Sequence, residues 1–123
     1  MSLLPFHRVD FPIQDIPPIF HESRYEDGEY LEVHPQKDEL QRHREIVAFF
    51  IREKGGWVYD INTYAPGYLL QSDTMTINCR FNMWIVVGWK TSKGDTIQIS
   101  KQTSEAFPVW PTQKHFESDN QRP

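Results

Sequence analysis

The side chains that could do metal or nucleophilic chemistry stand far apart in the sequence. The five histidines show no spacing typical of a zinc site, and the single cysteine, Cys79, has no cysteine partner. Arg80 beside Cys79 favours a thiolate, but strand alternation places the Cys79 side chain on the core face, where a thiol is inert. His43 falls in the apolar stripe of a predicted helix, where a histidine is usually packed. We predict no metal, no cofactor and no catalytic residue, with a small enzyme using His43 or acidic hairpin residues as an alternative.

Carboxylates concentrate near the N-terminus. Residues 1–35 carry a charge of −5 and residues 36–123 a charge of +1, within a net charge of −4. This asymmetry predicts either an acidic surface for a basic partner or charge complementarity within the fold. Five acids flank one predicted hairpin, where a close carboxylate pair could act as general acid and base: Glu22, Glu26, Asp27, Glu29 and Glu32. Nothing in the sequence singles out two of them.

Cationic and aromatic residues suggest a second function, the binding of single-stranded nucleic acid. Tryptophans could stack on bases beside a basic patch. Acidic residues lie among these cations and the whole chain is acidic, so electrostatic attraction to phosphate is poor. The sequence has no glycine-rich phosphate-binding motif. We therefore keep nucleic acid as an alternative partner only. The residues of the patch are Arg42, Arg44, Arg52, Lys54, Lys90, Lys93 and Lys101, with Trp57, Trp84 and Trp89.

Residues 1–18 form an extended, proline-rich arm in the predicted organisation. Four prolines fix the backbone and remove donors, so this segment should not be helical. Its apolar residues, Phe6, Phe11 and Ile13 among them, are too many for a free linker. We expect the arm to lie either on its own domain or on a neighbouring chain.

Residues 19–111 are predicted to form one α+β domain. A hairpin over 19–33 turns at Asp27-Gly28, and a long helix over 36–54 follows, with Pro35 at its first-turn position and Gly55-Gly56 at its end. One side of this helix carries an apolar stripe, and Phe49 falls outside it. A largely antiparallel meander sheet completes the domain, and residues 112–123 form a polar tail. The stripe consists of Leu40, Ile46, Val47, Phe50 and Ile51.

The meander begins with residues 57–62, in which Trp57, Tyr59 and Ile61 alternate onto one side. A turn at 65–68, a short strand YLLQ and a turn at Ser72-Asp73 follow. A further turn over 91–94 leads into the strand 95–100.

Residues 74–89 alternate apolar and polar side chains without a break. One straight strand would span about 53 Å, more than the roughly 35 Å width of a domain of this size. A three-residue loop, Arg80-Phe81-Asn82, keeps the apolar residues on one face and puts Asn82 at the left-handed position. A bent strand with a bulge is the competing interpretation. The second half is apolar on both faces, which predicts a central strand covered by the helix and by either the arm or a partner.

Aromatic residues make up 14% of the chain, and they favour a protein-interaction function over an enzymatic one. We predict a non-enzymatic interaction or assembly subunit, either a structural component of a phage or virus type particle or an acidic inhibitor of the immunity type. A protein partner or a homo-oligomer is expected. With no signal peptide and no membrane-spanning run, we expect a cytoplasmic protein. The predicted partner-binding residues are Phe6, Phe11, Ile13, Glu26, Asp27, Glu29, Phe49 and Trp110.

Overall fold

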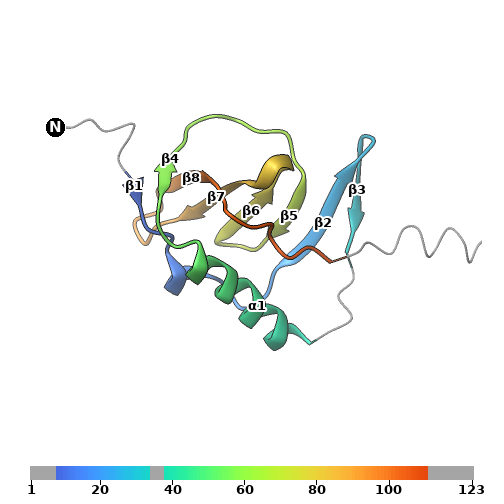
Figure 1. Ribbon diagram of the computed structural model, residues 1–123, viewed down its shortest axis with the longest axis horizontal. Coiled ribbons are helices and arrows are strands. Elements are labelled where there is room, and N and C mark those ends of the chain that lie inside the picture. Colours follow the sequence, from blue (N-terminus) through green and yellow to red (C-terminus); the bar gives the residue numbers. More distant parts are fainter. Residues whose placement is uncertain (1–7, 34–37, 111–123) are drawn as a thin grey trace, which may run out of the picture.

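The computed structural model describes residues 8–33 and 38–110, in which one α-helix packs against an antiparallel sheet of eight strands (Figure 1). The strand order is β1-β4-β8-β7-β6-β5-β2-β3, and the predicted α+β class is confirmed. The helix α1 is Glu39–Arg52, and two short 3-10 turns are η2 (Ile13–Asp15) and η3 (Phe81–Met83). The strands are β1 Arg8–Val9, β2 His21–Glu26, β3 Glu29–Glu32, β4 Trp57–Tyr59, β5 Tyr68–Gln71, β6 Met75–Cys79, β7 Trp84–Lys90 and β8 Thr96–Gln102.

Helix α1 is shorter than the predicted 36–54. Asp38 has extended backbone angles, and its side chain accepts a hydrogen bond of 2.7 Å from the backbone N–H of Gln41, so it caps the helix. The helix ends at Arg52, and the left-handed residue beyond it is Gly56, with φ of 85°. Pro35 lies outside the described residues.

The buried face of α1 differs from the predicted stripe. Phe49, expected outside the stripe, is 0% exposed, whereas Leu40 and Ile51 are 60% and 57% exposed. The Phe49 ring packs edge-on against Phe107, with centroids 5.0 Å apart. Phe107 belongs to the segment after β8, which covers the side of the helix that a periodicity argument leaves to solvent.

The described part of the N-terminal arm lies on its own domain. β1 pairs with β4 at the sheet edge. The Phe11 ring stacks on Phe50 at 3.9 Å, and the Phe11 N–H donates to the carbonyl of Lys54 at 2.7 Å. Phe11 and Ile16 therefore belong to the core of this chain.

One predicted turn is confirmed, and a second lies one residue later than predicted. Asp27 and Gly28, with φ of 50° and 83°, join β2 to β3. β6 and β7 are separate strands, and their loop is Phe81-Asn82-Met83, one residue later than predicted, because Arg80 N–H bonds to the carbonyl of Trp84 at 2.8 Å. Asn82 is left-handed as expected, with φ of 59°.

Strand β7 is central, between β6 and β8, as predicted. The one-residue shift of the loop preserves side-chain parity, so Met75, Ile77, Ile85 and Val87 are all buried under α1. The opposite face of the sheet is partly covered by the loop 60–67 of this same chain, whose Gly67 N–H donates to the Asn78 side chain at 2.9 Å.

The predicted strand over 57–62 is wrong in its second half. β4 ends at Tyr59, and Ile61 is 98% exposed. The Asp60 N–H still donates to the Gln98 carbonyl at 2.9 Å, and its carboxylate accepts hydrogen bonds from the Ser100 hydroxyl at 2.6 Å and from the Asn62 N–H at 2.9 Å. The chain then leaves the sheet and crosses its open face.

Candidate functional site

The most buried ion pair of the described residues joins the sheet to the helix. β2 places Glu22 opposite Arg42 of α1, with Arg42 Nε and Nη2 at 2.8 Å and 2.6 Å from its two carboxylate oxygens. The Tyr68 hydroxyl donates to Glu22 at 2.7 Å, and Glu45 accepts a further bond from Arg42. Since each charge has partners, this cluster holds the fold together and offers no free group for chemistry.

Two members of this cluster, Arg42 and Tyr68, have raised pKa values. Burial disfavours the charged guanidinium, but hydrogen bonds and the charge of Glu22 outweigh it and raise the pKa of Arg42. Burial also raises the pKa of Tyr68, so its hydroxyl keeps its proton. The Arg42 guanidinium lies 4.2 Å from the ring centroid of Trp110, which is half-buried.

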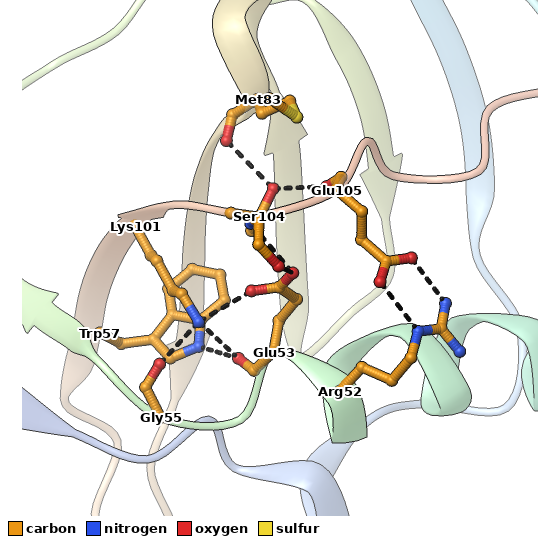
Figure 2. Close-up of polar contacts among 9 residues, drawn as sticks. Arg52, Glu53, Gly55, Trp57, Met83, Lys101, Ser104 and Glu105 are labelled. Atoms are coloured by element: carbon orange, nitrogen blue, oxygen red, sulfur yellow. Dashed lines mark hydrogen bonds and ion pairs between the residues drawn. The ribbon is translucent and has the colours of Figure 1, made fainter.

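A second cluster forms around Glu53, just after α1 (Figure 2). Its carboxylate accepts from the Ser104 N–H at 3.0 Å and hydroxyl at 2.5 Å, and Lys101 Nζ lies at 2.9 Å. Burial alone would raise the pKa of Glu53, but the bonds from Ser104 and Lys101 hold it below its usual range. Arg52 pairs with Glu105 at 3.1 Å beside it.

These pairs weaken the nucleic-acid interpretation. Arg42, Arg52 and Lys101 of the predicted basic patch are each engaged by a carboxylate. Trp57 is fully buried, so it offers no stacking surface.

The described residues bring together no cluster of reactive groups that would support the enzyme alternative. Burial raises the pKa of the Cys79 thiol, so it stays protonated. His43 is half-buried on α1. Among residues 8–33 and 38–110, no group of three or more His, Cys, Asp or Glu side chains could hold a metal ion.

The β2–β3 hairpin tip presents exposed acids around an aromatic pair. Glu26, Asp27 and Glu29 are all exposed. Tyr25 and Tyr30 meet edge-on, with centroids 4.8 Å apart, and remain 37% and 58% exposed. Glu26 also pairs directly with Glu29 across the strands. Like charges placed opposite each other destabilise a hairpin, so the Glu26–Glu29 pair lowers the stability of this hairpin.

A groove continues from this tip across the open face of the sheet. It lies between the hairpin and the loop 60–67, has a volume of about 350 Å³ and has no Asp, Glu, Lys, Arg or His in its lining. The lining is rich in tyrosine and in amide and hydroxyl side chains, a composition that suits recognition of another protein. Among its residues are Tyr30, Tyr64, Asn62, Thr76, Asn78 and Gln98.

Of the eight predicted partner-binding residues, some lie in the core, some pack against it and some are exposed. Phe11 and Phe49 are in the core, at 2% and 0% exposure, so they form no surface. Ile13 and Trp110 are half-buried and pack against that core, and Phe6 lies outside the described residues. The three exposed members are Glu26, Asp27 and Glu29.

Sequence reasoning missed the two tyrosines at the tip. Tyr25 and Tyr30 pair directly across the strands, and the two-residue turn at Asp27-Gly28 already implies this pairing. The signal was therefore present in the stretch YEDGEY. Glu22 gave no comparable signal, because its partner Arg42 is 20 residues away.

Comparison with known proteins gives no relative for this chain. No family model matches, and neither curated proteins nor solved structures give a significant match. Within the residues that the structure describes, no helix is long and apolar enough to cross a membrane.

Proposed function

We propose that this protein is a non-enzymatic interaction domain that binds a basic protein surface through the β2–β3 hairpin tip. The observation that carries the proposal is the exposure of three carboxylates around the Tyr25–Tyr30 pair. Tyrosine is enriched among residues that dominate binding energy, and carboxylates attract Lys and Arg side chains and steer their approach. An arginine that docks here meets both an aromatic face and a negative charge.

The like-charge pair at the tip supports a cationic partner. Glu26 and Glu29 repel each other in the free protein. A guanidinium or ammonium group between them relieves this repulsion, so part of the binding free energy comes from removing a cost already present in the free state.

The biological setting that fits best is an acidic inhibitor of the immunity type, which would mask a basic active surface. A subunit of a larger particle is the other setting, with a basic neighbour. Self-association through this tip is disfavoured because two acidic surfaces would meet. A cytoplasmic location belongs to the same proposal.

The test compares affinity capture by the wild-type protein and by a Glu26→Lys/Glu29→Lys variant. The wild type should retain a basic protein that the variant loses. A matched variant, Asp73→Lys/Asp95→Lys, makes the same charge change at two other exposed turn residues and should retain it. The complex, once isolated, should weaken as salt rises. Equal capture by the charge-reversed tip variant would refute the proposal.

A further inference from the structure

The loop between β6 and β7 borders a second hollow on the open face of the sheet. The loop lies at the same end of the sheet as the hairpin tip, because Tyr68 of β5 pairs with Arg24 of β2 and with Cys79 of β6. The hollow has a volume of about 320 Å³. Arg80 is the one charged residue in its lining. The other lining residues are Tyr64, Phe81, Asn82, Trp84 and Gln102.

The Arg80 side chain is held in place but not neutralised. Its Nε donates to the carbonyl of Ala65 at 3.0 Å, and its guanidinium carbon lies 5.2 Å and 5.1 Å from the ring centroids of Tyr64 and Phe81. The two terminal nitrogens bond to no described residue, and no described carboxylate lies in ion-pair distance. An arginine fixed in this way loses little freedom when it binds an anion.

Two further features belong to residues that line or adjoin the hollow. Nε1 of Trp84 is buried and has no hydrogen-bond partner among the described residues, a costly state that native proteins rarely keep. Asn82 takes the left-handed position of the loop, and Met83 beside it is also left-handed, with φ of 60°, a strained conformation for its residue type of the kind that collects at binding sites. Phe81 is 71% exposed beside them, so its ring can move without disturbing the core.

We propose that this hollow is a carboxylate-binding site in which the terminal nitrogens of Arg80 receive the anion between aromatic walls. A guanidinium fork matches the planar geometry of a carboxylate with two parallel hydrogen bonds. One guanidinium neutralises one negative charge, and no second cation lines the hollow, so a dianionic phosphate is poorly matched. The carboxylate belongs either to a small molecule or to an Asp or Glu side chain of a protein. This site does not depend on the hairpin surface proposed above.

The test follows the indole N–H resonance of Trp84, assigned with Trp84→Phe, during NMR titration of the whole chain. One arm uses benzoate as the small-molecule probe. The other uses an N-acetylated, C-amidated peptide whose one carboxylate is a Glu side chain. A saturable shift with either probe supports the site, and the tighter probe identifies the source of the carboxylate. Benzamide and inorganic phosphate should give no saturable shift.

Variants separate the site from nonspecific attraction. Arg80→Gln should weaken binding about tenfold or more. Arg52→Gln removes the same charge from an exposed ion pair and should leave binding unchanged. Phe81→Ala, at an exposed ring, should weaken binding several-fold in a folded protein. The proposal is overturned if neither probe shifts the resonance, if benzamide or phosphate does so equally, or if Arg80→Gln binds like wild type.

Discussion

The Glu22–Arg42 pair explains part of the uneven charge of the chain. Glu22 is one of seven acids in residues 1–35, and it meets a cation from the rest of the fold at 2.6 Å, with side chains only 2% and 6% exposed. Internal complementarity therefore accounts for this acid, while the acids at the hairpin tip face solvent. Internal complementarity is thus shown for Glu22, whereas an acidic surface for a basic partner at the hairpin tip is a proposal.

Replacing Arg42 with Met should destabilise the protein strongly. The change leaves the Glu22 carboxylate buried without its cation, which costs about 3–5 kcal/mol in the free energy of unfolding. Urea denaturation at pH 7 measures the loss. Arg52→Met removes a cation from an ion pair that is about half exposed, and it should change stability by less than about 1 kcal/mol. Similar losses for the two variants would contradict the assigned role of the buried pair.

Single residues were predictable where the constraint is local. Asn82 and the Asp27-Gly28 turn could be placed because a left-handed backbone favours Asn, Asp and Gly at positions fixed by nearby sequence. Phe49 could not be placed, because its burial depends on Phe107, which lies 58 positions later in the chain.

At the scale of elements, the start of α1 is set by its N-cap residue, Asp38. The sequence interpretation used Pro35 and placed the start at 36, yet the side chain of Asp38 satisfies a free N–H of the first turn. Asp38→Ala should lower the free energy of unfolding by about 1 kcal/mol. Thermal and urea denaturation measure it. Asp38→Ser keeps an acceptor at the cap and should retain most of the stability; a loss as large as that of Asp38→Ala would contradict the capping role.

The loop 60–67 depends on a close approach at Gly67. A Cβ added there would lie 2.5 Å from the carbonyl oxygen of Cys79, which is backbone and cannot swing aside. Gly67→Ala should therefore destabilise the protein by about 1–3 kcal/mol and move the loop away from β6. Gly88→Ala is the control, because its nearest atom would be 3.7 Å away. Unfolding curves and the amide shifts of residues 60–67 provide the measurements, and an unperturbed Gly67→Ala would refute the argument.

The strands were predictable where alternation and turn residues agree, as in β5 to β8. Strand ends were not predictable where the alternation of apolar and polar residues continues beyond the paired residues. Trp57, Tyr59 and Ile61 share a parity, but the carboxylate of Asp60 caps the end of β4 and Ile61 faces solvent. Hydrophobic parity alone does not reveal such a hydrogen bond.

At the scale of the whole molecule, the sheet order depends on contacts between distant segments. β4 follows the helix, yet it lies between β1 and β8 at the far side of the sheet from β3 (Figure 1). The α+β class followed from the order of elements, but this placement did not, since short-range patterns say nothing about which edge β4 joins. The same limit applies to the hollow around Arg80, whose residues come from the loop 60–67, the β6–β7 loop, β7 and β8, whereas the hairpin tip is one contiguous stretch of sequence.

The acid limit of stability should be set by carboxylates that join distant segments. Besides Glu53, Asp60 accepts bonds from Ser100 and Tyr64; burial would raise its pKa, but these bonds lower it below the usual range. A carboxylate with a lowered folded-state pKa contributes stability that is complete above its unfolded pKa, about 4, and is lost as pH falls through the folded value. The wild-type free energy of unfolding should therefore decline steeply below about pH 4.5.

Glu53→Gln should be less stable than wild type at pH 7, and its free energy of unfolding should decline less over that range. Glu105→Gln, about half exposed in its ion pair, should follow the wild-type curve. If Glu53→Gln instead declined in parallel with wild type, the Ser104 and Lys101 bonds would not be lowering the pKa of this carboxyl group, and another group would have to account for the acid transition.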